Sequence, residues 1–352
     1  MPAFLSAFPT LAIDLSSPRA GLGDVRLDRP ECIQATVARA AALGVDLCIL
    51  DDGLDTRPQG ARPLGHEPVT LAAFLAVGVP RIGFAITAAP AAFEPYNLAR
   101  LLASADHVSG GRAAWQLSLD DGARQAGLQP ATSADGRDAR RASEAAALLR
   151  ALWESWEADA FLRDKASGAF IDTDKVHYVD HAGPHYAVRG PLNVARPPQG
   201  HLPVIGRVDA LLAGVAPAAF DVLRGSAAGP DAWARLRGAV SARAPGWRGR
   251  LWSDVTVVAG AASASLPAGA AGTGLVLAGD AQALRRQLAD WVSTARPDGL
   301  VLRFAGGLAG AAAGLDALSP LWAGVRPASW AARSLRERLA LPAFVPARPL
   351  AA

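Results

Sequence analysis

Apolar runs alternate with amphipathic stretches along the first half of the chain. The runs VDLCILDD (residues 45–52), RIGFAITAA (81–89) and RAAWQLSL (112–119) predict strands that are buried on both faces, as in a parallel sheet. The stretches between them have helical spacing, as in LDRPECIQATVARAAALG (27–44) and EPYNLARLLASADHV (94–108). Repeated βα units of this kind predict a parallel sheet with right-handed crossovers.

The alternation breaks at about residues 157–200. There the sequence HYVDHAGPHYAVRGPLNV alternates around HAGPH, which predicts a β-hairpin with a Gly-Pro turn. The βα order then resumes at LPVIGRV (202–208) and continues to DGLVLRFA (298–305). About eight strands in this order predict an α/β fold. The fold we expect is a (β/α)8 TIM barrel with a mid-chain hairpin excursion, forming a single domain over residues 1–352. A doubly wound open sheet is the alternative.

Three loops are interpreted from their composition and their place in this order. Residues 106–115, DHVSGGRAAW, resemble either a phosphate-binding loop or a turn between a helix and a strand. Ligand groups of a barrel gather where strands end, whereas this loop comes before a strand, so we interpret it as a structural turn in which Arg112 pairs locally. The Ala- and Gly-rich segments 259–274 and 305–315 are expected to be mobile loops.

Charge and cysteine usage narrow the class of protein. The formal net charge is +3, and the arginines are scattered, with no basic run interleaved with aromatic residues, so nucleic acid is not an expected partner. No apolar stretch reaches the ~20 residues of a membrane span, and the first residues carry no basic leader, so no membrane association is expected. With Cys32 and Cys48 as free thiols, a cytoplasmic protein is expected.

Two blocks carry a family resemblance. Residues 94–115, EPYNLARLLASADHVSGGRAAW, and residues 150–200, from RALWESWEADAF to NVARPPQG, resemble the luciferase-like superfamily of flavin-dependent monooxygenases. The similarity is closest to the branch of nitrilotriacetate monooxygenase component A and the dibenzothiophene sulfone monooxygenases. It covers most of residues 27–206 and 275–342.

The resemblance implies a two-component FMN-dependent monooxygenase. Reduced FMN would come from a separate NAD(P)H:flavin reductase, and with O₂ it would oxygenate a small organic substrate containing sulfur or nitrogen. Family members commonly pair through barrel helices, and Trp153 and Trp156 lie on a predicted long Ala-rich helix near the family's dimer region, so a homodimer is expected. No catalytic residue is assigned.

Candidate flavin contacts follow from the same resemblance at strand ends. Asp52 matches an acidic residue that ends an early strand in the family, and Thr87 matches a threonine near the flavin ring. Gln116 replaces the family's asparagine, which keeps the amide and adds a methylene. The alternative interpretation of Asp52 is a helix cap or a surface carboxylate.

Other positions depart from the family pattern. Asp135 and Ala139 stand where the family has a His and a Tyr that help to hold FMN, and Leu211 stands at a phosphate-binding Ser. Arg207, which stands at a Gln, or Arg224 would then be the phosphate partner, although an ordinary surface role is the simpler interpretation of both. These losses leave open an alternative, a degenerate barrel that has lost flavin binding and acts as a binding or scaffold protein.

Three histidines, His177, His181 and His185, lie within nine residues of the excursion. A metal site and a structural hairpin both suit this spacing. The family shows the same spacing without a metal, so the resemblance implies a hairpin and no metal ligands. The sequence also contains no Ser–His–Asp order, no P-loop and no GxGxxG motif.

Overall fold

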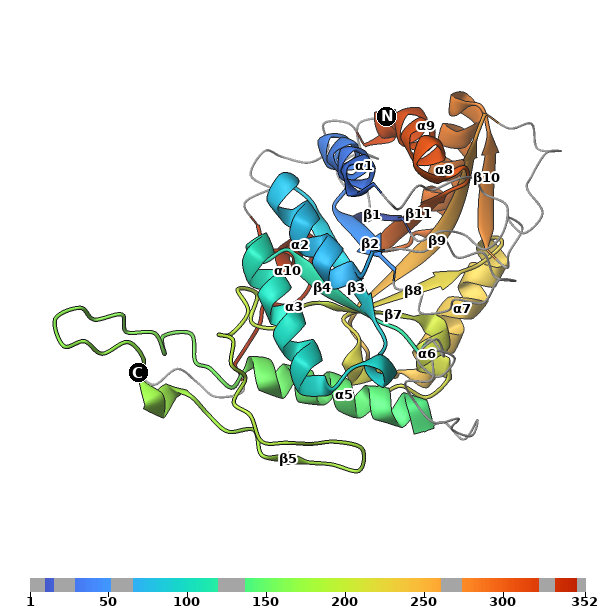
Figure 1. Ribbon diagram of the computed structural model, residues 1–352. Coiled ribbons are helices and arrows are strands. Elements are labelled where there is room, and N and C mark those ends of the chain that lie inside the picture. The colour runs from blue at the N-terminus through green and yellow to red at the C-terminus, as the bar shows by residue number, and fades with distance from the viewer. Residues whose placement is uncertain are drawn as a thin grey trace.

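The computed structural model describes residues 10–15, 29–51, 66–119, 137–260, 274–322 and 333–346. Eight parallel strands form a closed ring in which each strand pairs with the next and the last pairs with the first (Figure 1). In order around the ring they are β1 (Thr10–Asp14), β2 (Leu47–Leu50), β3 (Gly83–Ala88), β4 (Ala113–Leu117), β7 (Val204–Arg207), β8 (Val222–Ser226), β9 (Arg250–Ala259) and β11 (Gly299–Phe304). The predicted (β/α)8 barrel is confirmed, and the open sheet is excluded.

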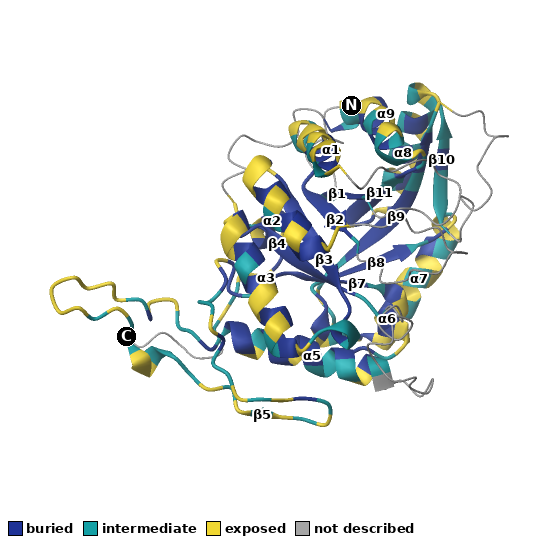
Figure 2. Cartoon of the chain, viewed as in Figure 1, coloured by how far each residue is buried: buried dark blue, intermediate teal, exposed yellow. Residues whose placement is uncertain are grey.

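Helices surround the barrel and bury one face each against it (Figure 2). They are α1 (Pro30–Ala42), α2 (Pro68–Gly78), α3 (Pro95–Ser109), α5 (Arg137–Trp153), α6 (Val208–Leu212), α7 (Pro230–Arg243), α8 (Ala281–Ala295) and α9 (Gly307–Leu318). Short 3₁₀ turns occur at η3 (Pro90–Ala92), η4 (Thr173–Lys175), η5 (Pro217–Ala219) and η7 (Ser319–Leu321). Four of the helices begin with a proline, whose fixed φ and missing N–H suit the first helical position.

Helix α9 overturns one prediction, because residues 305–315 were expected to form a mobile loop. Gly306 takes the left-handed conformation at the start of this helix, and Ala311 and Leu315 are buried in the core. Gly314 lies against the ring of Phe304, which an added Cβ would meet at 2.4 Å. Small residues here permit close packing on β11, so tertiary packing outweighs their weak helical pattern.

Two strands were not predicted from the sequence. The apolar run of β1 is only a few residues long and stands near the start of the chain. Strand β10 (Leu275–Gly279) pairs with residues 255–259 of β9, just beyond the part of β9 that pairs with β8. Residues 261–273, most of the predicted loop 259–274, lie outside the described residues.

The excursion leaves the barrel after α5 and returns before β7 (Figure 1). Within it, β5 (His181–Ala182) and β6 (Ala187–Val188) form an antiparallel hairpin around the predicted Gly-Pro turn. This part of the prediction is confirmed. The excursion is mostly half-buried or exposed, in contrast to the strands of the barrel (Figure 2).

The amino end of the barrel is closed by α10 (Leu335–Arg338) and the chain around it. Leu335, Leu339 and Leu341 join the side chains inside the barrel in one apolar cluster. The SGG turn lies at this end and is structural, as predicted. Gly110 ends α3 in the left-handed conformation. The expected local pairing of Arg112 holds only for the carbonyl oxygen of Ser109, because the other three acceptors, the carbonyl oxygens of Ala76, Val79 and Ile82, lie 30–36 positions away in sequence.

Candidate functional site at the carboxyl ends of the strands

Side chains inside the barrel form two successive layers. The layer toward the amino ends is apolar and consists of Ala12, Leu47, Ile49, Ala85, Ala114, Ile205, Val222, Trp252 and Val301, closed below by α10. Two residues further along each strand, the alternation of side chains returns to the same face. These positions are all polar and are called the polar layer here: Asp14, Asp51, Thr87, Gln116, Arg207, Arg224, Asp254 and Arg303.

Arg224 is the centre of the polar layer, and its side chain is only 1% exposed. Its Nη2 donates to Asp14 Oδ2 at 2.6 Å, and its Nε donates to Asp254 Oδ1 at 2.8 Å. Its Nη1 donates to Gln116 Oε1 at 2.9 Å, and Gln116 Nε2 donates to Thr87 Oγ1 at 2.8 Å. One buried guanidinium group thus joins five strands of the barrel through direct or relayed hydrogen bonds.

Opposite charges keep these groups ionised although they are buried. Burial raises the pKa of Asp14, but the charges of Arg224 and Arg303 outweigh it and hold this pKa below its ordinary value. For Asp254 the same burial is outweighed by Arg224, Arg303 and Arg207, which lower the pKa to about 2. Burial lowers the pKa of Arg224, and Asp254 and Asp14 raise it above its ordinary value. The network is therefore ionic at neutral pH.

Two further arginines form the outer edge of the polar layer. Arg207 Nη1 donates to Asp254 Oδ2 at 3.2 Å, and Arg303 Nε donates to Asp14 Oδ2 at 3.1 Å. Their side chains are 42% and 33% exposed, so both guanidinium groups also reach solvent. Arg207 pairs in addition with Asp209, which is largely exposed. This edge is where the layer offers charge to a ligand.

Three of the predicted site residues lie together. Thr87, Gln116 and Arg207 belong to the polar layer, as their places at strand ends implied, whereas Asp52 lies outside the described residues. Arg224 corrects an expectation, because it is buried in an ion-paired network and has no surface role. Its position on β8 directs the side chain into the barrel, where the buried carboxylates lie.

Sequence reasoning missed Asp14, Asp254 and Arg303. A signal for them was present, because each follows an inward apolar residue by two positions, as in AID, WSD and VLR. Reading that signal requires knowledge of which face of each strand points into the barrel. For a strand buried on both faces, the sequence does not supply it.

The residues that depart from the family pattern can also be located in the structure. Ala139 and Leu211 are buried in the core between the barrel and its helices, and Asp135 lies outside the described residues. Trp153 is 1% exposed and donates to Ala99 O, and the indole of Trp156 donates to Leu192 O. Both indole N–H groups thus donate hydrogen bonds within the same chain, and the two tryptophans give no support to the expected dimer.

Glutamates hold the three histidines of the excursion. His177 Nε2 lies 2.7 Å from Glu157 Oε1, and His181 Nε2 and His185 Nδ1 lie 2.9 and 2.6 Å from the two oxygens of Glu144. Glu144 lies on α5, so these contacts attach the hairpin to the barrel's outer helix. The described part of the chain contains no group of three or more His, Cys, Asp or Glu side chains placed to hold a metal ion.

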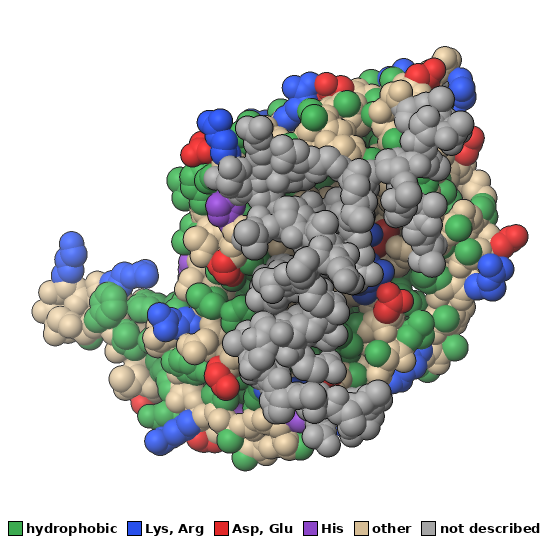
Figure 3. Space-filling view, turned by 45° about the vertical axis from the view of Figure 1, so that its right-hand side comes forward, with side chains coloured by type: hydrophobic (Ala, Val, Ile, Leu, Met, Phe, Trp, Pro, Cys, Tyr) green, Lys and Arg blue, Asp and Glu red, His purple; other side chains and the backbone are tan. Residues whose placement is uncertain are grey.

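Charged side chains of both signs are dispersed over the face shown in Figure 3, without a large patch of one sign among the described residues. Among the helices of the described residues, none is both long and apolar enough to cross a membrane.

The donors of the polar layer suit FMN, the cofactor that the resemblance implies. Arg207 and Arg303 combine partial exposure with the fork of N–H groups that binds phosphate and other oxyanions. The Thr87 hydroxyl accepts from Gln116, which leaves its own proton available to an acceptor atom of the ring. Each nitrogen of the Arg224 guanidinium already donates to Asp14, Asp254 or Gln116 and the side chain is 1% exposed, so Arg224 supports the layer from within and does not face a ligand.

Comparison with known proteins identifies relatives over most of the barrel. The family model described as luciferase-like monooxygenase matches residues 10–223. The chain is 39% identical to the N-acetyl-S-(2-succino)cysteine monooxygenase of Bacillus subtilis over 175 residues, which are 48% of this chain and 39% of that protein. It is 42% identical to the dibenzothiophene-sulfone monooxygenase of Rhodococcus erythropolis over 171 residues, which are 48% of this chain and 36% of that protein.

A solved structure supports the fold independently. Riboflavin lyase with modified FMN and riboflavin has a TM-score of 0.79 to this chain at 20% sequence identity, covering 94% of this chain and 95% of that one. The alignments to the two curated relatives are shorter, and the chain spans 39% of the first and 36% of the second.

Proposed function

The chain belongs to the luciferase-like monooxygenase family, and from this premise we propose that it is the oxygenating component of a two-component FMN-dependent monooxygenase. Reduced FMN would come from a separate NAD(P)H:flavin reductase. The substrate would be a small organic compound containing sulfur or nitrogen, in keeping with the sulfone named for one relative. The observation that carries the proposal is a polar layer at the carboxyl ends of the strands, where barrel enzymes place their sites.

Each group of the layer has a role in this proposal. Bound reduced FMN supplies the electrons that activate O₂, and the protein supplies orientation and charge. Arg207 and Arg303 would hold the phosphate, and the Thr87 hydroxyl would donate to the ring. Asp14 and Asp254 fix Arg224, which in turn fixes the amide of Gln116 and through it the Thr87 hydroxyl. The buried ion pairs thus preorganise the donors.

A titration of the purified protein under anaerobic conditions tests the proposal. Reduced FMN is expected to bind saturably and more tightly than reduced riboflavin, because only FMN carries a phosphate for the arginines at the edge. Oxidised FMN and oxidised riboflavin provide the matched pair for the other redox state. If neither redox state of either flavin binds at millimolar concentration, the monooxygenase proposal falls and the degenerate-barrel alternative takes its place.

We also propose that the protein is a homodimer, on the strength of the family resemblance alone. The chain has a mass of 36.2 kDa, so static light scattering is expected to give twice that value. A mass equal to that of one chain across a wide concentration range would refute the proposal.

A further inference from the structure

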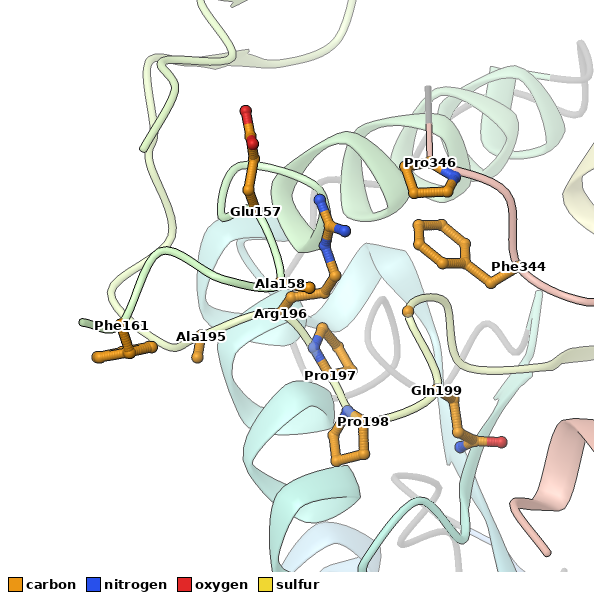
Figure 4. Close-up of a pocket in the computed structure, with 11 residues that line it drawn as sticks. Glu157, Ala158, Phe161, Ala195, Arg196, Pro197, Pro198, Gln199, Phe344 and Pro346 are labelled. Carbon is orange, nitrogen blue, oxygen red and sulfur yellow. The ribbon is translucent and has the colours of Figure 1, made fainter. Parts of the chain in front are cut away.

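A cavity of about 460 Å³ lies away from the polar layer, between the excursion and the C-terminal segment (Figure 4). It adjoins the amino end of the barrel. Gln199, one of its lining residues, donates to Ala113 O at the first residue of β4 and to Asp106 Oδ1 at the end of α3. Its volume lies within the range of about 300–1,000 Å³ that is usual for small-molecule sites.

Arg196 is the cation of this cavity. Its guanidinium carbon lies 5.5 Å from the centre of the Phe344 ring, a cation–π distance. Its Nε is buried and has no hydrogen-bond partner, and no ion pair to Arg196 occurs among the described residues. Arg112 at the same end donates to four carbonyl oxygens, so Arg196 is an exception there. An unpaired buried donor is costly, which favours an acceptor from a ligand.

Apart from Arg196, Gln199 and Glu157, the side chains that line the cavity are apolar. Pro197 and Pro198 lie below the Arg196 side chain, and the ring of Phe344 faces it from the C-terminal segment (Figure 4). Phe161 lies at the outer edge, where it stacks on Trp156 at 5.2 Å between ring centres. Phe344 also contacts His201, at 4.6 Å between ring centres, so it is held in place beside the cavity. The rings of Phe344, Pro197 and Pro198 offer apolar surface to a ligand and no hydrogen-bonding side-chain groups of their own.

The acidic residue of the cavity is already engaged. Glu157 lines it, but its Oε1 is 2.7 Å from His177 Nε2, and among the described residues no ion pair joins Glu157 to Arg196. The charge of Arg196 also acts on Asp159, but that carboxylate does not line the cavity and forms its ion pair with Lys175. A guanidinium without an ion pair of its own, beside one engaged carboxylate, suits an anion of one charge better than a phosphate of two. The planar fork of arginine matches a carboxylate with two parallel hydrogen bonds.

We propose that this cavity binds a small organic carboxylate with a flat apolar body. The carboxylate pairs with Arg196, and the body lies between Phe344 and the rings of Pro197 and Pro198. The ligand contacts the excursion and the C-terminal segment at once, so its binding couples two parts of the chain that are far apart in sequence. The site is separate from the polar layer and needs no flavin.

The experiment uses 4-fluorobenzoate as the probe, observed by ¹⁹F NMR with the full-length protein and no flavin. We expect saturable broadening of the probe signal, and no comparable effect with neutral 4-fluorobenzamide. Arg196→Gln is expected to weaken binding by about tenfold or more, the factor that corresponds to one charge-assisted hydrogen bond. Arg189→Gln, which removes a 75% exposed arginine of the same excursion, is the matched control and should leave the affinity unchanged.

Two further variants separate loss of the site from loss of the fold. Arg196→Lys keeps the charge and should retain part of the affinity, and Phe344→Leu should weaken 4-fluorobenzoate while leaving the thermal midpoint near that of the wild type. Equal binding by the wild type and Arg196→Gln overturns the proposal, as does an absence of saturable binding. Loss of probe binding in Arg207→Ala would place the probe at the polar layer and overturn it too. All of these results leave the flavin titration, and hence the proposed function, to its own test.

Discussion

Buried aspartates at opposite ends of the barrel, Asp14 and Asp254 at one and Asp106 at the other, are held in different ways. At the carboxyl ends, Asp14 and Asp254 share a buried guanidinium, that of Arg224. At the amino ends, Asp106 accepts from neutral donors only, the side-chain amide of Gln199 and the backbone N–H groups of Gln199 and Ala113. One end is an ionic network across the barrel, and the other is a local brace between α3, β4 and the chain before β7.

The pKa values differ accordingly. Burial raises the pKa of Asp106 to about 6, since its hydrogen bonds from neutral groups lower it less than burial raises it. At the other end, the arginine charges outweigh an equal burial and lower the pKa of Asp254 to about 2. Burial alone thus does not decide the charge of an aspartate. A full counter-charge within hydrogen-bonding distance does, and Asp254 has one whereas Asp106 has none.

The largest effect should come from removing that counter-charge. Arg224→Met leaves Asp14 and Asp254 buried without their central partner, and we expect the free energy of unfolding at pH 7 to fall by about 3–5 kcal/mol. Urea denaturation followed by circular dichroism measures it. The loss should shrink at acidic pH, because the two carboxyl groups of the variant take up protons.

Arg207→Met is the matched control for this change. It removes an arginine of the same layer whose side chain is 42% exposed, so the expected loss is about 1 kcal/mol or less. If Arg224→Met costs no more than Arg207→Met, the carboxyl end is not held by its buried ion pairs.

At the amino end of the barrel, the titration of Asp106 should make the free energy of unfolding depend on pH. The folded pKa of Asp106, about 6, lies above the ordinary value of 3.8, so the folded state binds more protons than the unfolded state between these values. The contribution of Asp106 is therefore fully present below pH 3.8 and is lost as pH rises through 6, by up to about 3 kcal/mol. Denaturation curves collected at several pH values in this window measure the slope.

Asp106→Asn should flatten that slope, because the variant has nothing to titrate at this position, even if its stability is lower throughout. Asp316→Asn, at an aspartate whose side chain is 50% exposed, should keep the slope of the wild type. Asp14 and Asp254 do not interfere, since their lowered pKa values confine their effect to pH below about 4. A slope that persists in Asp106→Asn would assign it to another group.

A smaller effect is expected for flavin binding at the carboxyl end. Arg207→Ala should weaken reduced FMN by about tenfold, because one charged phosphate contact is lost, and should leave riboflavin unchanged. The FMN affinity of the wild type should also fall with added salt, more than that of the variant. Fluorescence or absorbance titration gives the dissociation constants of FMN and riboflavin. Unchanged FMN affinity in Arg207→Ala would remove this residue from the proposed phosphate site.

The smallest effect should lie at the cap of α10. Ser334 accepts from the N–H of Glu337, and the Glu337 carboxylate accepts from the N–H of Ser334. Ser334→Ala should lower the free energy of unfolding by about 1 kcal/mol, with flavin binding unaltered. No change in the denaturation curve would mean that Leu335 and Leu339 hold α10 under the barrel without help from its cap.

Local patterns in the sequence determined much of this protein. Apolar runs with flanking helices predicted the order of the barrel, the Gly-Pro turn predicted the hairpin, and the position of the SGG turn before a strand identified it as structural. Strand ends and the family resemblance together indicated Thr87, Gln116 and Arg207. These features depend on residues a few positions apart, or on their order along the chain.

Tertiary structure alone decided which charges meet. Arg224 pairs with Asp14 across 210 positions of sequence and with Gln116 across 108, and Arg303 reaches Asp14 across 289. Closure of the barrel through β11 and β1 sets these contacts. It also selects which of two equally buried faces of each strand points inward, and in a strand that is apolar on both faces no local pattern marks that choice. The partnerships, and with them the ionisation of the site, therefore arise only when the ring of strands is complete.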